Sequence, residues 1–189
     1  MIRIVLVGDT LSGKSTLFDS LLFDNYYKSL KNYQSFITTV SPTFGIYLDK
    51  YIVYDTPSDK RWRSFANPYI KVADAAIVLF DAEEGGECVE EWKNYVKDTN
   101  GKDIPMLVVA NVKNKFKHEK QPNVLYINCK EDVHDKLQPF LTSLQSDPRI
   151  SIGLVDYLLL LLPSVEDVSD RMGQLQIPGC LRQTIGKGL

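Results

Sequence analysis

The residues best suited to chemistry lie near the start of the chain, in the run Gly8-Asp9-Thr10-Leu11-Ser12-Gly13-Lys14-Ser15-Thr16. This run contains the pattern G-x-x-x-x-G-K-[S/T], in which successive backbone N–H groups cradle phosphate oxygens. Lys14 would add a point charge for the β- and γ-phosphates, and Ser15 would offer its hydroxyl to Mg²⁺. The run therefore predicts a binding site for a Mg²⁺-bound nucleotide.

A second metal-side residue is expected at the end of a neighbouring strand. The apolar run Tyr51–Tyr54 is followed by Asp55, whose carboxylate would hold Mg²⁺ through water. The alternative interpretation is that Asp55 caps a following helix. We expect the metal role, because a second metal-side residue is expected at the end of a neighbouring strand and Asp55 stands at such an end.

These residues need a scaffold that gathers strand ends around one site. Short β-branched or aromatic apolar runs predict strands at residues 2–7, 44–48, 51–54, 75–80, 106–110 and 124–127. Helical patterns cover residues 14–30, 87–96 and 133–144, and residues 31–42 are expected to form a loop. The alternation predicts an α/β fold of the P-loop NTPase class, with a mostly parallel sheet covered by helices on both faces.

Composition narrows the class of protein further. The chain has 189 residues and a net charge of −2, so it lacks the basic field that nucleic-acid binding requires. Its three cysteines are far apart and show no metal-binding or disulfide spacing, which favours a reducing compartment. We expect a cytoplasmic protein, with a nuclear location as the alternative.

With these motifs the chain resembles the Ras superfamily of small GTPases, most closely its Rab-like branch. The resemblance covers roughly residues 1–145, and it is carried by residues 8–16, 41–45, 55–56, 61–64 and 69–81. It implies a GTP/GDP switch that needs Mg²⁺ and contacts protein partners through two switch loops. Thr43 would be the Mg²⁺-binding threonine of the first loop, and Thr39 is the alternative because Thr43 lies unusually close to Asp55 in sequence.

Two weaker resemblances point to assembly subunits. Residues 149–170 are similar to the C-terminal part of the centromere protein M family. Residues 55–95 and 128–144 are similar to the Rab-like subunit of intraflagellar transport trains. The alternative to a switch is therefore a pseudo-GTPase that serves as a structural subunit of a multiprotein assembly.

The chain departs from the family at the hydrolysis motif. Ser58 replaces the glycine that senses the γ-phosphate, and Asp59 replaces the glutamine that orients the attacking water. A carboxylate at this place would repel phosphate anions. If the chain hydrolyses GTP, we expect Lys14 and Asp59 to take part and the intrinsic rate to be slow without a partner.

The base-recognition motif N-K-x-D also differs, since it appears as Asn111-Val112-Lys113-Asn114. Guanine presents two donors to this motif, and Asn114 can accept only one, at a cost on the order of 1–3 kcal/mol. Cys129 and Lys130 stand where the family has a further base-contacting pair, and could supply a backbone N–H and an aliphatic stem. The alternative is that residues 111–114 are only a loop after a strand, so the base remains open.

The C-terminal part extends beyond the resemblance. We expect a nucleotide-binding domain at residues 1–146, an apolar helix at 147–163 and a flexible tail at 164–189. The helix would either pack on its own domain or dock a protein partner. Cys180 is not in a C-a-a-X position, so we expect no direct lipid anchor.

Overall fold

The protein is built on a six-stranded sheet with the order β2-β3-β1-β4-β5-β6. The computed structural model describes residues 1–23, 39–59, 61–113, 120–131 and 133–150. The strands are β1 (Ile2–Gly8), β2 (Thr43–Tyr47), β3 (Tyr51–Asp55), β4 (Ala75–Asp81), β5 (Met106–Asn111) and β6 (Val124–Ile127). Only β2 runs antiparallel to its neighbour; the other pairings are parallel. The predicted α/β fold is confirmed.

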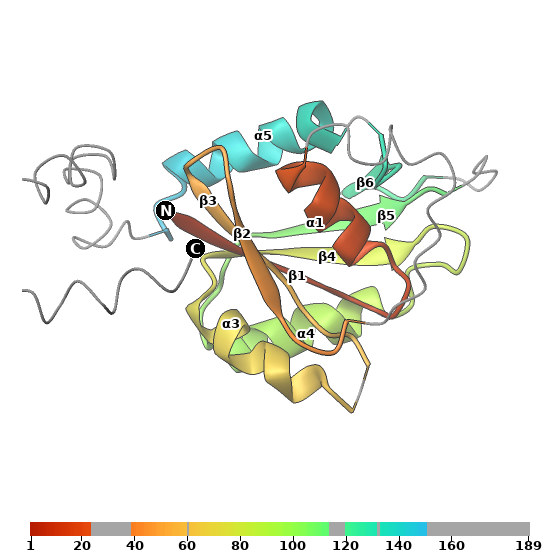
Figure 1. Cartoon of the computed structure of the whole chain (residues 1–189), viewed down its shortest axis with the longest axis horizontal. Helices are drawn as coiled ribbons and strands as arrows, with labels where there is room; N and C mark the ends of the chain where they lie inside the picture. The colour runs from red at the N-terminus through yellow and green to blue at the C-terminus, as the bar shows by residue number, and fades with distance from the viewer. Residues whose placement is uncertain (24–38, 60, 114–119, 132, 151–189) are drawn as a thin grey trace, which may run out of the picture. The chain divides into compact units, whose positions relative to one another are not determined.

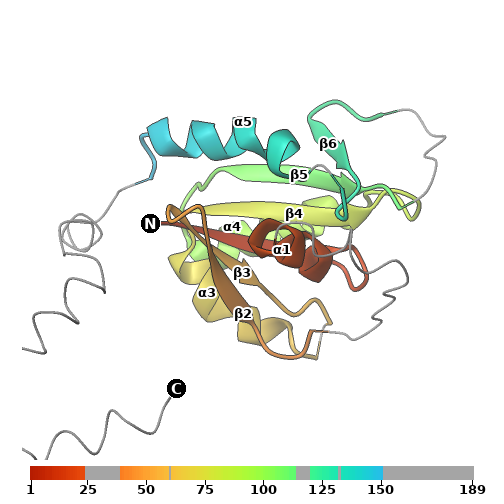
Figure 2. The same cartoon turned by 45° about the horizontal axis from the view of Figure 1, so that its top comes forward.

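Helices cover both faces of the sheet. The helices are α1 (Lys14–Leu22), α3 (Asn67–Val72), α4 (Val89–Asn100) and α5 (Val133–Ser146), with a short 3₁₀ turn, η1 (Arg63–Ala66), before α3. Figures 1 and 2 show α1 and α5 on one face and α3 and α4 on the other. No helix in the described part of the chain combines the length and apolar character needed to cross a membrane.

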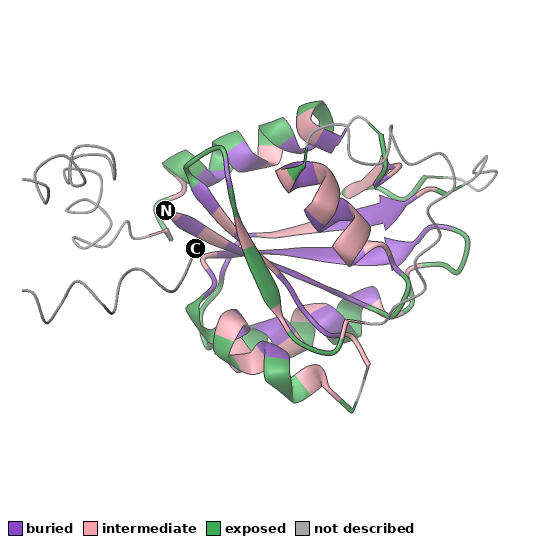
Figure 3. Ribbon diagram, in the orientation of Figure 1, coloured by how far each residue is buried: buried purple, intermediate pink, exposed green. Residues whose placement is uncertain are grey.

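The two faces of the sheet carry separate apolar cores. One core joins alternate residues of β1, β3 and β4 to α1 and α5, and the other joins the intervening residues to α3 and α4. Every residue of β4 is buried, as expected for a central parallel strand that is covered on both sides (Figure 3). The sheet is therefore a rigid support for the residues at its edge.

Strand register brings the candidate site together. Because β1 is parallel to β3 and β4, the carboxyl ends of the three strands meet at one edge. Asp55 ends β3, Asp81 ends β4, and Asn111 ends β5 opposite Asp81. The loop after β1 lies at this same edge, so the sequence motif and these polar residues share one site.

Some local features differ from the expected ones. The short elements η1 and α3 were not expected, because they have only four and six residues. Pro68 lies in the first turn of α3, a position that favours a helix start. The β2–β3 turn has positive φ at Leu48 (52°) and Asp49 (51°), as in a tight hairpin turn. The second part of the expected helix at residues 14–30 lies outside the described residues.

The expected C-terminal elements are for the most part not described. Residues 147–150 form a turn after α5, and residues 151–189 lie outside the described residues. The helix at 147–163 and the tail at 164–189 therefore stay predictions.

Candidate functional site

The loop between β1 and α1, residues 9–13, is shaped by two glycines. Gly8 has φ 141° and Gly13 has φ 102°, values that side-chain-bearing residues rarely adopt. A Cβ on Gly8 would lie 1.9 Å from the carbonyl oxygen of Leu79. A Cβ on Gly13 would lie 2.3 Å from Asn111 Nδ2. Both positions of the motif therefore require glycine, which brings the loop close to the sheet edge.

Lys14 is held inside this loop. Its Nζ donates hydrogen bonds to the carbonyl oxygens of Gly8 (3.0 Å) and Asp9 (2.8 Å). The residue is only 5% exposed, and burial lowers the pKa of Lys14 to about 8, against the opposing effect of Asp55. A buried ammonium gains most from an anion placed beside it. The environment of Lys14 therefore fits a phosphate group.

The start of α1 also suits an anion. The helix has Gly13 as its N-cap, a residue with no side chain that could accept a hydrogen bond from the first turn. The first N–H groups of a helix lack intrahelical partners, and the helix dipole favours negative charge at this end. This helix start and Lys14 together fit the phosphates predicted from the sequence.

The side chain of Asn111 holds the phosphate loop through hydrogen bonds. Its Nδ2 donates to the Ser12 carbonyl (3.1 Å), and its Oδ1 accepts from the Cys129 backbone N–H (3.2 Å). The backbone N–H of Cys129, which we expected to serve the base, is thus engaged by Asn111. A direct contact of Asn111 or Cys129 with a base stays a prediction.

The side chain of Lys113 is a second brace of the phosphate loop. Its Nζ donates to the Leu11 carbonyl at 3.1 Å and forms an ion pair with Asp81 at the end of β4. Leu11 has φ 65° and is half exposed, so the brace holds the loop at a strained residue. Sequence analysis did not single out Asp81, although a carboxylate directly after the apolar run 75–80 was a signal that could have identified it.

Lys130 and Asn114 are the other residues expected to contact the base. The Lys130 backbone N–H is bonded to Asn128 Oδ1 (3.0 Å), which shapes the turn after β6. Asn114 lies outside the described residues, so its predicted role in base selection is untested.

The metal-side residues form a compact set of oxygens. Ser15 Oγ donates to Asp55 Oδ2 at 2.6 Å and lies 2.9 Å from Thr39 Oγ1. Asp55 Oδ1 is buried and has no hydrogen-bond partner among the described residues. Burial raises the pKa of Asp55, while the Ser15 hydrogen bond and the charge of Lys14 act in the opposite direction. An unsatisfied buried carboxylate oxygen beside two hydroxyls fits a hard cation such as Mg²⁺.

The threonine in this set is Thr39, the alternative of the sequence analysis. Thr43 lies in β2 opposite Asp55, with an exposed side chain. The hydrogen bonds of the described residues link Thr39, and not Thr43, to Ser15 and Asp55. The described geometry favours Thr39, because the chain before β2 brings its hydroxyl to Ser15 and Asp55, and the metal role of either threonine stays a prediction.

The hydrolysis-side residues are paired with neighbours. Arg61 binds both carboxylate oxygens of Asp59, with Nη2 2.6 Å from Oδ2 and Nε 3.0 Å from Oδ1. Hydrogen bonds from Arg61 lower the pKa of Asp59 to about 2. The Ser58 hydroxyl lies 3.1 Å from that of Thr10 in the phosphate loop. Asp59 is thus a weak base with a compensated charge, so it repels phosphate less than the sequence alone suggested.

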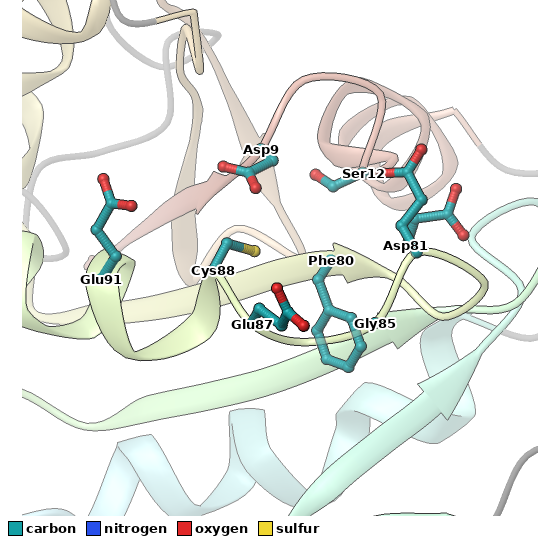
Figure 4. A pocket seen from close by; sticks show the side chains of 9 residues that line it. Asp9, Ser12, Phe80, Asp81, Gly85, Glu87, Cys88 and Glu91 are labelled. Carbon is teal, nitrogen blue, oxygen red and sulfur yellow. The ribbon is translucent and has the colours of Figure 1, made fainter.

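A pocket of about 360 Å³ adjoins the other side of the phosphate loop (Figure 4). Acidic side chains dominate its lining, which consists of Asp9, Ser12, Phe80, Asp81, Glu84, Gly85, Glu87, Cys88 and Glu91. These carboxylates would repel a phosphate chain. The pocket therefore does not fit a phosphate chain, whereas Lys14 and the start of α1 do.

Comparison with known proteins gives one family match. The family model "Ras of Complex, Roc, domain of DAPkinase" matches residues 3–115. This range includes the phosphate loop, the Ser15–Thr39–Asp55 set and Asn111.

Curated relatives match over a similar part of the chain. Human Ras-related protein Rab-22A is 29% identical over 125 residues, which cover 60% of this chain and 59% of that protein. The GTP-binding protein ypt5 of Schizosaccharomyces pombe is 30% identical over 117 residues, with coverages of 60% and 54%. A Ras and EF-hand domain-containing protein of Danio rerio is 29% identical over 120 residues, with coverages of 58% and 17%. The chain thus spans less than two thirds of the length of these relatives.

Proposed function

The chain belongs to the Ras superfamily, and from this premise we propose that it binds a guanine nucleotide with Mg²⁺ and acts through protein partners as a divergent switch with slow or partner-assisted hydrolysis. The observation that carries the proposal is the contact of Ser15 with Asp55 beside the phosphate loop. The buried Asp55 oxygen without a hydrogen-bond partner among the described residues would be stabilised by a cation. The buried Lys14 ammonium would be stabilised by an anion. A Mg²⁺–polyphosphate complex supplies both charges.

The residues divide the binding between them. Lys14 and the first N–H groups of α1 would hold the phosphates, and Ser15, Thr39 and Asp55 would hold the metal, directly or through water. When bound, Mg²⁺ would neutralise charge on the β- and γ-phosphates. Thr39 precedes β2, so its engagement at Ser15 would order the first switch loop in the triphosphate state.

Slow hydrolysis is supported by the Asp59–Arg61 pair. The pKa of Asp59, about 2, leaves the carboxylate too weakly basic to activate water at neutral pH. Both of its oxygens are already bonded to Arg61, so Asp59 is not free to orient a water molecule. A partner that contributed its own catalytic group would overcome this deficit.

An exposed apolar row supports the proposed protein partner. Phe44 and Ile46 are 67% and 52% exposed and lie on one face of the edge strand β2, and Leu48, 56% exposed, follows them in the β2–β3 turn. The Phe44 ring lies 6.4 Å from that of Tyr54, which lies 5.1 Å from that of Tyr69 in α3. Contiguous exposed apolar side chains of this kind mark protein-binding surfaces. The row begins next to the first switch loop, so its partner would be a protein that distinguishes the nucleotide states.

A structural subunit is the second candidate function, and the same Asp59–Arg61 pair favours it. A chain that binds nucleotide but does not turn it over would serve as a scaffold. Phosphate release measured over many turnovers separates the two candidates. A measurable rate, alone or with a partner, supports the switch, and a bound nucleotide that remains intact supports the subunit.

The proposal is tested by titrating the protein with a fluorescent guanine nucleotide in Mg²⁺ and in EDTA. We expect binding in Mg²⁺, much weaker binding in EDTA, and loss of binding in Lys14→Ala. The partly exposed surface lysine of α4 gives a matched control, because Lys93 pairs only with Glu90 among the contacts described here, and Lys93→Ala should bind as the wild type does. Equal binding by Lys14→Ala and the wild type would contradict the proposed site.

A further inference from the structure

Trp92 lies between the phosphate loop and the segment that follows Ser58. It belongs to α4, is 1% exposed, and touches residues of both regions. The indole N–H points to one region, and the ring face points to the other. A buried tryptophan that satisfies its N–H with a charged group holds that group in one orientation.

On the loop side, Trp92 fixes Asp9. The indole Nε1 donates to Asp9 Oδ1 at 2.8 Å. The Asp9 carbonyl accepts from Lys14 Nζ, so the same residue contacts the lysine of the phosphate site. If the Asp9 carboxylate turned toward the phosphates, its negative charge would repel them and weaken nucleotide binding. The Asp9 side chain, bonded to Trp92, lines the acidic pocket, as Figure 4 shows for Asp9.

On the other side, Trp92 supports Arg63 of η1. The guanidinium carbon lies 3.7 Å from the centre of the Trp92 ring and 4.4 Å from that of Tyr95. Arg63 Nη1 also forms an ion pair of 2.7 Å with Glu91. The Arg63 Nε is buried without a hydrogen-bond partner among the described residues, so the stacked rings and Glu91 hold the side chain in place.

We propose that Trp92 is a positioning residue for nucleotide binding, which keeps the Asp9 carboxylate away from the phosphates and joins the phosphate loop to Arg63. The inference rests on the proposed function, because it concerns the same phosphate site. It adds a residue from α4 that contacts no phosphate itself. Any change in the loop on nucleotide binding would reach the Trp92 ring through Asp9.

Trp92→Phe tests the role of the N–H, because it keeps an aromatic ring under Arg63 and removes the donor to Asp9. We expect nucleotide affinity to fall about tenfold, the order given by one hydrogen bond to a charged group. Trp62→Phe is the matched control: Trp62 stacks on Phe65 at 5.8 Å, away from Asp9, and its affinity should be unchanged. Trp92→Phe binding as tightly as the wild type would overturn the inference and leave the proposed function intact.

The Asp9→Ala variant shows whether Trp92 acts on nucleotide binding through Asp9 or through the stability of the fold. In Asp9→Ala, Trp92→Phe should cause no further loss of affinity, because the group that Trp92 orients is gone. A further tenfold loss in this background would overturn the inference, since Trp92 would then act by another route. If the wild type itself bound no nucleotide, the proposed function would fail first, which is a distinct outcome.

Fluorescence gives a readout that does not need a Trp92 variant. The chain contains two tryptophans, so Trp62→Phe leaves Trp92 as the sole indole emitter. We expect the emission maximum or intensity of Trp92 to change when Mg²⁺ and a guanine nucleotide are added, and to change back when EDTA releases them. Unchanged Trp92 emission at a nucleotide concentration that saturates binding would overturn the coupling between the loop and Trp92.

Discussion

The Ser15 hydroxyl donates a hydrogen bond of 2.6 Å to the Asp55 carboxylate, although the two residues are 40 positions apart in the chain. Parallel pairing of β1 with β3 brings them together, because the loop after β1 and the end of β3 lie at one edge of the sheet. The second Asp55 oxygen remains buried and unsatisfied among the described residues. The pair therefore fits the proposed Mg²⁺ site, in which the free Asp55 oxygen would face the cation.

Ser15→Ala should weaken nucleotide binding in Mg²⁺ about 10- to 100-fold, because it removes a hydroxyl from the metal-side set. In EDTA the variant and the wild type should bind almost equally, since the metal contribution is then absent from both. Titration with a fluorescent guanine nucleotide under both conditions measures the difference. An equal loss with and without Mg²⁺ would mean that Ser15 acts on the phosphates rather than on the metal.

Gly8→Ala should destabilise the fold by roughly 3 kcal/mol or more, because the new Cβ would collide with the Leu79 carbonyl at a backbone angle that disfavours alanine. Gly101→Ala is the matched control. Gly101 also has a positive φ, 73°, but its Cβ would meet nothing within 4 Å. It should cost only about 1 kcal/mol, from backbone strain alone. Urea unfolding gives both values, and similar losses would refute the close approach of Gly8 to β4.

Lys113→Ala should weaken nucleotide binding and lower stability by about 1–2 kcal/mol. The variant frees the Leu11 carbonyl and leaves the nearly buried Asp81 carboxylate without its cation. The half-exposed position of Lys113 keeps the loss below that of a fully buried pair. Thermal unfolding with and without nucleotide measures both effects. A variant that lost stability but kept full affinity would show that this brace does not serve the site.

Asn114→Asp should raise affinity for GTP, by up to about a hundredfold, because an aspartate accepts hydrogen bonds from both guanine donors. The wild type should discriminate less between GTP and XTP than the variant does. Thermal shifts with GTP, XTP and ATP test this order. A wild-type preference for GTP as strong as that of the variant would show that other residues select the base.

Asp59→Gln should raise the rate of GTP hydrolysis about tenfold or more in single-turnover measurements, because a neutral amide can orient water and is released from Arg61. Asp59→Ala removes the charge without supplying an orienting group, so its rate should stay close to that of the wild type. If alanine accelerated hydrolysis as much as glutamine did, charge rather than water orientation would limit the rate.

The phosphate loop could be predicted from the sequence because its chemistry is local. Gly8, Gly13, Lys14 and Ser15 lie within one loop, and the apolar run before them and the helical pattern after them fix their surroundings. The central strands β1 and β4 could be predicted for the same reason, since their burial on both faces leaves an apolar run in the sequence. The metal-side role of Asp55 could be proposed because Asp55 stands at the end of such an apolar run.

The remaining contacts depend on register between strands that are distant in sequence. Asp81 lies opposite Asn111 only because β4 and β5 pair in one particular register, and this pairing puts Lys113 within reach of Asp81 and Leu11. The choice of Thr39 over Thr43 depends on how the chain enters β2, which spacing alone does not determine. The contact of Trp92 with Asp9 joins α4 to the phosphate loop, and no local pattern marks it.

The nucleotide content of the purified protein shows whether the phosphate loop holds a guanine nucleotide. Protein prepared in Mg²⁺ without added nucleotide would be denatured, and the released nucleotides quantified by chromatography. We expect close to one guanine nucleotide per wild-type chain and little in Lys14→Ala. Wild-type protein that releases no nucleotide, and that no Mg²⁺–nucleotide stabilises against thermal unfolding, would contradict the proposed nucleotide binding.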